Sequence, residues 1–325
     1  MEKAKRIAEF DFFKGIAIFL VVVGHVILNN VEGALDSHPV YTWIYSFHMP
    51  LFFFISGFLI HHTLGNRSIG TCIKKKFLSL LVPYFVWCFV VAPFVNGESL
   101  PTLLYVIAET DGRYWFVYLL FLFSVFYYVG QLKQRNVRGV LGGALLSLLV
   151  FVIVQLIYPC EVTSRGLQFL PFFVLGVISS AFDLKEKAAI FRDPLPSLAT
   201  VLFLATSLRY CQIDIPLMSK ALKFLASFSF CYLMLFYING RFLYEENRIV
   251  KMIAYTGKNT IVIYLTHFFM VKLLPFPIAE NLSPYPFWVF VLGVLVAMII
   301  IPACLLLGKL AERFKWINRI VYGRY

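Results

Sequence analysis

Apolar runs of about 20 residues recur along this chain of 325 residues, with short charged segments between them. One such run is long enough for a helix to cross the hydrocarbon core of a bilayer. Hydrophobic residues make up 60% of the chain and charged residues 14%, whereas a typical soluble domain is about a quarter charged. The sequence therefore predicts an all-α, polytopic integral membrane protein.

About ten membrane spans fit this pattern. They cover approximately residues 10–30, 41–62, 77–96, 114–132, 139–158, 166–183, 195–212, 219–240, 259–275 and 286–308. Most Lys and Arg residues lie at the N-terminus, at the C-terminus and in every second connecting segment, while the other segments carry mainly acidic residues. Because cytoplasmic loops are enriched in Lys and Arg, we predict that both termini are cytoplasmic. An even number of spans agrees with this prediction, because it places both termini on the same side of the membrane.

The loops are short, so we expect a single transmembrane domain over residues 1–325 with no appended soluble domain. The net charge of +12 does not indicate nucleic acid, because the cations gather in short segments next to apolar runs. The partner that this distribution predicts is the lipid bilayer, and the oligomeric state stays open. The six cysteines lack zinc-site spacing, so no metal is expected.

Three histidines fall at membrane depth, which is a costly place for an ionisable side chain. His25 lies about a turn from the predicted outer end of the first span, His48 lies about two turns below the outer surface in the second, and His267 lies near the middle of the ninth. A lone intramembrane histidine is most simply a packed residue bonded to a neighbouring helix. Three of them favour a catalytic interpretation, because neutral imidazole accepts a proton at physiological pH.

Lys14 lies about one turn inside the predicted cytoplasmic end of the first span, about 16 Å of helix rise from His25. Asp11 precedes it by three residues. The two could form an ordinary helix ion pair, Lys14 could snorkel to the interface, or the pair could belong to a site for an anionic ligand. Lys75 and Lys76, before the third span, could add to such a site or could be ordinary cytoplasmic cations.

Two further segments have alternative interpretations. Arg113 and Trp115 open the fourth span at the predicted outer surface, where they fit either an aromatic belt or a sugar site. Ser56–Gly57 indicates close packing between helices more than a nucleophile. The sequence contains no serine-hydrolase elbow, zinc-protease motif, phosphate loop or dinucleotide fingerprint.

Taken together and in this order, several segments resemble membrane-bound acyltransferase family three, and especially its fucose 4-O-acetylase-like branch of sugar O-acetyltransferases. The resemblance runs nearly from end to end. The matching segments are Asp11-Phe-Phe-Lys14-Gly-Ile-Ala with His25, Phe47-His48-Met-Pro-Leu-Phe-Phe-Phe-Ile-Ser56-Gly57, Lys76-Phe-Leu-Ser-Leu-Leu-Val-Pro83-Tyr84, Tyr114-Trp115-Phe116, Pro171-Phe-Phe-Val-Leu-Gly176 and Tyr255-Thr-Gly257-Lys258-Asn259 through Tyr264-Leu-Thr-His267. The basic residue followed by histidine, with ten residues between them, is the family's most specific feature.

The resemblance implies transfer of an acetyl group from cytoplasmic acetyl-CoA to a hydroxyl of a cell-surface or exported carbohydrate, in the cytoplasmic membrane of a bacterium. His25 would be the base or would carry the acetyl group transiently, and His48 or His267 would orient the acceptor or stabilise the oxyanion. A longer donor such as succinyl-CoA stays open, and so does the acceptor. The residues implied for acetyl-CoA are Lys14, Lys75 and Lys76, and those implied for the acceptor site are Asp11, Arg113, Trp115, Asn259 and Tyr264.

The chain departs from the family pattern in two places. Lys14 stands where the family usually has Arg, which keeps the charge but loses bidentate phosphate geometry. Of the family's basic pair before the third span, only Lys76 is present, because Ser79 occupies the second position. A glycan transporter or flippase, or a membrane component that only assembles a biosynthetic complex, would have a similar architecture. The Lys14–His25 pair, without a deep carboxylate relay, favours the acyltransferase.

Overall fold

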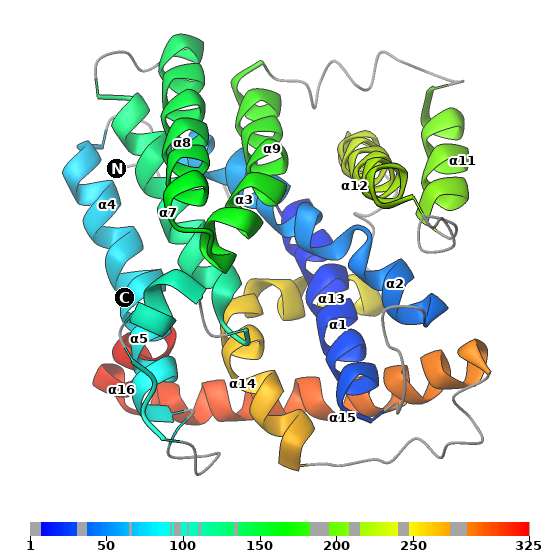
Figure 1. Ribbon diagram of the computed structural model, residues 1–325. Helices are drawn as coiled ribbons and strands as arrows, with labels where there is room; N and C mark the ends of the chain where they lie inside the picture. The colour runs from blue at the N-terminus through cyan, green and yellow to red at the C-terminus, as the bar shows by residue number, and fades with distance from the viewer. Residues whose placement is uncertain are drawn as a thin grey trace. The chain divides into compact units, whose positions relative to one another are not determined.

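The computed structural model describes residues 8–30, 38–64, 67–91, 93, 99–102, 104–109, 112–132, 136–182, 195–207, 215–239, 247–273 and 285–324. Within these ranges the regular structure is helical and there is no strand, which confirms the predicted all-α class (Figure 1). The chain divides into two compact units, which are described separately. The first comprises Met1–Phe52 and Asp183–Leu306, and the second Phe53–Phe182 and Leu307–Tyr325.

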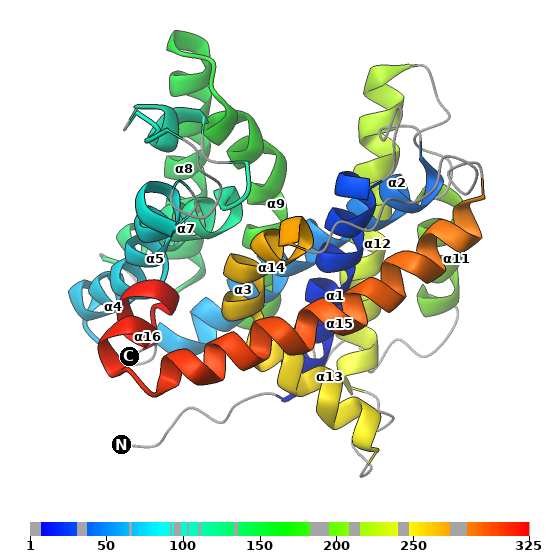
Figure 2. The same cartoon turned by 90° about the horizontal axis from the view of Figure 1, so that it is seen from below.

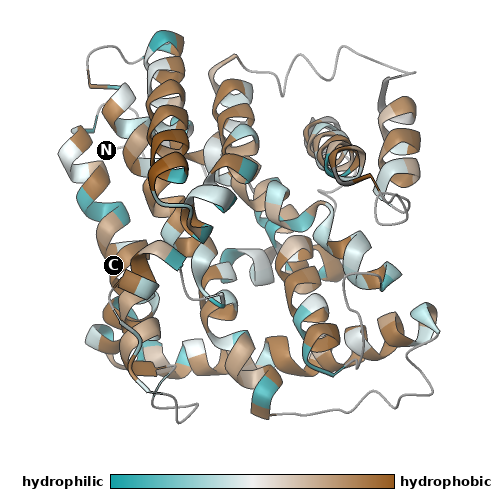
Figure 3. Ribbon diagram, in the orientation of Figure 1, coloured by the Kyte–Doolittle hydropathy of each residue, from teal (hydrophilic) through white to brown (hydrophobic). Residues whose placement is uncertain are grey.

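Within the described ranges, six helical segments are long and apolar enough to cross a bilayer, and one of them comprises two consecutive helices. These are Glu9–Asn30, Pro39–His61, Val137–Ile157, Glu161–Ala181, Leu217–Leu235 and Pro286–Glu312. Three shorter apolar helices, α7 (Trp115–Gly130), α11 (Leu195–Ser207) and α14 (Thr260–Leu273), coincide with further predicted spans. Apolar residues dominate α8 (Val137–Ile157) and α15 (Pro286–Glu312) along most of their lengths (Figure 3). The chain is thus a multi-pass membrane protein.

The first unit is arranged around α1 (Ala8–Asn30), which packs against α2 (Pro39–Tyr45), α13 (Arg248–Lys258) and α14. Helix α11 packs against α12 (Pro216–Asn239) (Figures 1 and 2). The unit also contains the start of α3 (His48–Leu64) and most of α15.

Two glycines allow α1 and α13 to cross with their backbones in contact. A Cβ atom on Gly257 would lie 1.7 Å from the carbonyl oxygen of Asp11, and one on Gly15 would lie 2.0 Å from that of Ile253. Small residues permit such close helix crossings in membranes. The crossing fixes the N-terminal segment of α1 that carries Asp11 and Lys14.

The predicted second span is broken just before His48. Helix α2 ends at Tyr45 and α3 begins at His48. Pro50 has no N–H to donate to the carbonyl of Ser46, four residues earlier, so a regular helix cannot continue there. The hydroxyl of Ser227 on α12 donates a hydrogen bond to that carbonyl instead. A broken helix is tolerated in a membrane when its freed backbone groups find such partners.

Replacing Ser227 with Ala should leave the buried carbonyl of Ser46 without this donor. We expect the free energy of unfolding to fall by about 1–3 kcal/mol, the cost of an unsatisfied buried acceptor. Thermal unfolding of the purified protein in detergent or nanodiscs measures the change. Ser164→Ala, at an exposed site on α9 (Glu161–Ala181), is the control. Equal stability of the two variants would show that the hydrogen bond from Ser227 does not stabilise the break between α2 and α3.

The second unit contains the rest of α3, a continuous helical run from Ile69 to Val91, and the helices α7, α8, α9 and α16 (Lys315–Tyr322). Helix α8 packs on α7 and α9. Its buried residues include Gly139, Gly143 and Ser147 at intervals of four, whereas its other faces expose Leu and Val side chains. This division is typical of a helix with one face on protein and the others on lipid.

Gly57 on α3 lies directly against α9. A Cβ atom on Gly57 would lie 2.0 Å from the carbonyl oxygen of Phe173, and one on Gly176 would lie 2.0 Å from that of Phe54. The two contacts are reciprocal, so the helices cross with glycine on both sides. This confirms the interpretation of Ser56–Gly57 as a close-packing site.

The third predicted span, 77–96, differs from a regular α-helix. The helical run consists of α4 (Ile69–Lys76), a π-helical turn (Phe77–Leu81), α5 (Val82–Val86) and a second π-helical turn (Trp87–Val91). The amphipathic helices α13 and α16 were not predicted. Helix α16 ends at Gly323 with φ 62° and docks on Trp87, whose Nε1 donates to the carbonyl of Val321 at 2.9 Å.

Candidate active site

His25 on α1 and His267 on α14 lie side by side in the first unit. Their ring centroids are 4.9 Å apart, with the rings tilted by 55°. The ring of Phe268 meets His25 edge-on at 5.6 Å. His267 is fully buried, whereas His25 is half-buried. Of these two histidines, His25 is therefore the one that a ligand can reach.

The hydrogen bonds of the two more deeply buried histidines fix their tautomers. His267 Nδ1 lies 3.0 Å from the carbonyl oxygen of Ile263 and 2.8 Å from that of Tyr264. His48 Nδ1 lies 2.6 Å from the carbonyl oxygen of Ile44. A carbonyl oxygen only accepts, so each Nδ1 carries the proton and each neutral ring keeps its lone pair on Nε2.

The structure also links His48 to the same group of side chains. The ring of Tyr45 packs edge-on against His48 at 4.7 Å and also lies against Gly24, the residue before His25 on α1. His48 therefore lies in the same region of the first unit as His25 and His267. Their catalytic roles remain a prediction.

Lys14 and Asp11 form an ion pair, with Nζ 2.6 Å from Oδ1. The Asp11 carboxylate is buried, and the Lys14 side chain keeps about a fifth of its surface exposed (21%). The helix pair proposed as one alternative is therefore present. The ion pair is compatible with a site for an anionic ligand. An ammonium group has three donors, and the Asp11 carboxylate contacts only one side of it.

Asn259 and Tyr264 lie on the segment that leads to His267. Asn259 ends α13, and its Nδ2 donates to the carbonyl of Tyr255 at 2.8 Å, which holds the corner between α13 and α14. Tyr264 is buried, with its ring 5.9 Å from that of His267. Acceptor binding by either residue stays a prediction.

Lys75 and Lys76 end α4 in the second unit. Lys75 is exposed and Lys76 is half-buried. Burial, and after it the charge of Lys75, lowers the pKa of Lys76 to about 8, so its ammonium group remains mostly charged at neutral pH. Cations in the last turn of a helix also interact favourably with its carbonyl end.

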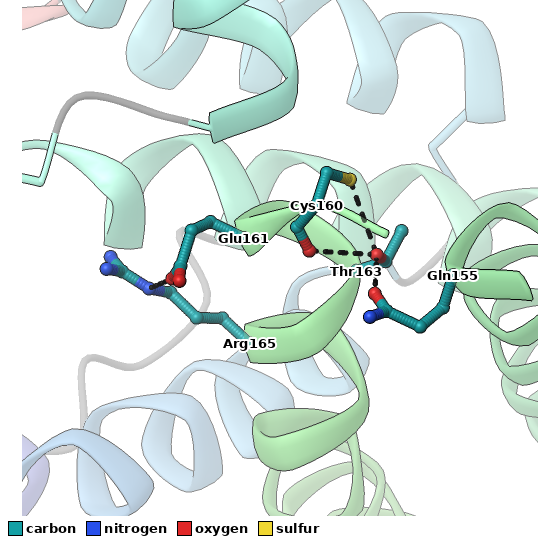
Figure 4. A network of polar contacts seen from close by, with 5 residues as sticks. All are labelled: Gln155, Cys160, Glu161, Thr163 and Arg165. Carbon is teal, nitrogen blue, oxygen red and sulfur yellow. Dashed lines mark hydrogen bonds and ion pairs between the residues drawn. The ribbon is translucent and has the colours of Figure 1, made fainter. Parts of the chain in front are cut away.

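Trp115, also in the second unit, belongs to a stack that the sequence analysis missed in part. The guanidinium group of Arg165 lies 4.8 Å from the centre of the Trp115 ring, and Phe169 stacks on that ring at 5.2 Å. Glu161 accepts a hydrogen bond from Arg165 Nε at 2.8 Å (Figure 4). Arg113 lies 5.9 Å from the ring of Tyr114.

The beginning of α9 is held by a second group of polar contacts. The hydroxyl of Thr163 donates to Gln155 and contacts the thiol of Cys160 at 3.3 Å (Figure 4). Helices α8 and α9 are thereby tied together next to Glu161 and Arg165. The described residues contain no group of three His, Cys, Asp or Glu side chains that could hold a metal ion.

Comparison with known proteins identifies the family. The family model described as "Acyltransferase domain" matches residues 7–307. Nodulation protein NolL of Mesorhizobium japonicum is 34% identical over 122 residues, which are 35% of this chain and 33% of that protein. NolL of Sinorhizobium fredii is 38% identical over 119 residues, 34% of this chain and 32% of that protein.

The matched segments thus span about a third of these relatives. No solved structure matches the chain. The family match extends over both units and includes each histidine of the candidate site. The chain belongs to membrane-bound acyltransferase family three.

Proposed function

We propose that this protein transfers an acetyl group from cytoplasmic acetyl-CoA to a hydroxyl of a cell-surface or exported carbohydrate, in the cytoplasmic membrane of a bacterium. The observation that carries the proposal is the half-buried imidazole of His25, packed against a second imidazole on an apolar helix. Such a group is a general base within reach of a ligand. Family membership supplies the reaction class.

The proposed reaction begins when His25 Nε2 takes the proton of the acceptor hydroxyl. The oxygen then attacks the thioester carbonyl of acetyl-CoA, and a C–O bond forms. As the tetrahedral intermediate collapses, the C–S bond breaks and the CoA thiolate takes the proton from His25. The products are the O-acetyl ester and free CoA. In a variant of this route, His25 first accepts the acetyl group on its own nitrogen.

Lys14 is the residue we propose for the phosphates of CoA, with Lys75 and Lys76 as further candidates. It lies about three helical turns from His25 along α1, a distance that the extended pantetheine arm of CoA can cover. Asp11 holds the Lys14 side chain in one place, so less freedom is lost when an anion binds. For the acceptor we propose Asn259 and Tyr264, because both lie on the segment of the first unit that leads to His267.

The contribution of Lys14 can be separated from its ion pair with Asp11. Lys14→Met alone would leave a buried carboxylate unpaired, so we pair it with Asp11→Asn. The double variant should fold normally and raise the KM for acetyl-CoA about 10-fold or more, the loss of one charge-assisted hydrogen bond. Lys14→Arg should keep the KM close to that of the wild type. An unchanged KM in the double variant would remove Lys14 from the donor site.

The proposed function is tested in cells of the source bacterium that lack the gene. NMR of the isolated surface carbohydrates should show loss of O-acetyl signals, restored by the wild-type gene and not by His25→Ala. If the deletion strain lacked the carbohydrate itself at its surface, and not only the O-acetyl groups, the result would indicate transport instead. Unchanged O-acetyl signals in the deletion strain would contradict the proposal.

A further inference from the structure

The two imidazoles of His25 and His267 each have a nitrogen that lacks a hydrogen-bond partner within the described part of the chain. In His25 this nitrogen is Nδ1, and in His267 it is Nε2. Both atoms are buried. The centroids of the two rings are only 4.9 Å apart, and yet neither atom has a hydrogen-bond partner among the described residues. Buried polar atoms are normally satisfied, so a pair of unsatisfied ones on adjacent rings requires an explanation.

The tautomer of His267 determines what it can offer to His25. Its Nδ1–H group is held by two carbonyls of its own helix. In the neutral ring, Nε2 can therefore only accept a hydrogen bond. It cannot donate one to an oxyanion, which was one of the roles expected for this residue.

We propose that His267 is a positioning residue that accepts a hydrogen bond from His25 Nδ1–H and thereby holds His25 in its Nδ1–H tautomer. This inference rests on the proposed function of His25 as base. The bond requires a rotation of the His25 ring from the observed arrangement, in which the ring centroids lie 4.9 Å apart. The torsion that turns an imidazole has a broad minimum and allows such a rotation. The lone pair of His25 then lies on Nε2, on the accessible side of the ring.

The arrangement resembles the base-and-orienter pair of a catalytic triad, with a neutral imidazole in place of the carboxylate. When His25 Nε2 takes the proton of the acceptor hydroxyl, the imidazolium keeps its Nδ1–H bond to His267. The protonation state of His267 does not change during the reaction. Its contribution is that the unprotonated Nε2 of His25, with its available lone pair, always faces the acceptor.

The test is ¹⁵N NMR of histidine-labelled protein in nanodiscs, with the His25 signals assigned by their loss in His25→Gln. We expect neutral His25 in the Nδ1–H form in the wild type. In His267→Phe it should shift toward the Nε2–H form that a free histidine side chain prefers. In His267→Gln the side-chain oxygen can replace Nε2 as acceptor, so the Nδ1–H form should largely persist.

The kinetic expectation follows from the tautomer. His267→Phe should lower kcat about 10-fold or more and leave the KM for acetyl-CoA unchanged, and His267→Gln should recover part of the loss. Thr266→Val is the matched control, because Thr266 is a buried neighbour on the same helix whose hydroxyl donates to the local carbonyl of Val262 at 2.7 Å and also contacts the thiol of Cys304, not the ring of His267. It should change neither tautomer nor kcat.

An Nε2–H tautomer for His25 in the folded wild-type protein, or a tautomer that is the same in His267→Phe, would overturn the inference. The NMR measurement needs no substrate. It therefore distinguishes failure of this pair from failure of the proposed function, which would appear as absence of acetyl transfer in the wild-type protein.

Discussion

Replacing His25 with Gln should lower the kcat for acetyl transfer by about 10²–10⁴-fold, the usual contribution of a positioned general base. Gln is close to histidine in size and can still bond through its amide, but it cannot take up a proton at neutral pH. The measurement is transfer of radiolabelled acetyl groups from acetyl-CoA by purified protein in nanodiscs. The KM for acetyl-CoA should change little, because the proposed donor contacts lie at Lys14.

Two controls distinguish loss of the base from misfolding and from a general effect of substitutions in α1. Thermal unfolding should show that His25→Gln folds like the wild type, because the ring is half-buried and packs mainly on Phe268 and His267. Asn29→Ala removes an exposed side chain one turn further along α1 and should retain the wild-type kcat. If His25→Gln and Asn29→Ala had the same kcat, His25 would not be the base.

Gly257→Ala should have the largest effect on stability. The added Cβ atom would lie 1.7 Å from the carbonyl oxygen of Asp11, and neither backbone can move away without separating α1 from α13. Overpacking of this kind costs about 3 kcal/mol or more when backbone is involved. We expect a lower Tm, a lower yield of folded protein, and loss of transfer because α1 carries Lys14 and His25.

Gly142→Ala is the matched control for this substitution. Gly142 lies inside α8, and a Cβ atom there would meet nothing within 4 Å. Alanine at such a site should leave the Tm unchanged or raise it, since glycine is less favourable than alanine inside a helix by about 0.5–1 kcal/mol. Equal Tm values for the two variants would show that the α1–α13 crossing is not tight.

Much of the fold could be predicted from the sequence, because a long apolar run has few alternatives in a membrane. The helices α1, α8 and α15 follow directly from such runs. The short helices α13 and α16 could not be found in this way, because they are half polar and their apolar faces acquire a partner only in the folded chain. The break before His48 follows from Pro50, but its partner Ser227, which donates to the freed carbonyl of Ser46, is remote in sequence and visible only in the structure.

For the candidate site, the sequence indicated which ionisable groups reach membrane depth but not how they are oriented. The contact between His25 and His267 depends on the packing of α14 against α1. Of the three alternatives for Lys14, the ion pair with Asp11 is present in the structure. Arg165 was not singled out, although the spacing of four residues between Glu161 and Arg165 in an apolar segment was a signal for a fixed guanidinium group.

The most direct test of the whole account is transfer by purified protein in proteoliposomes that are supplied with acetyl-CoA, labelled in the acetyl group, and with carbohydrate from the source cells. The account predicts that the label appears as an O-acetyl ester on the carbohydrate, that one CoA is released for each ester formed, and that His25→Gln abolishes both. Release of CoA without labelled carbohydrate, or equal labelling by wild type and His25→Gln, would contradict it.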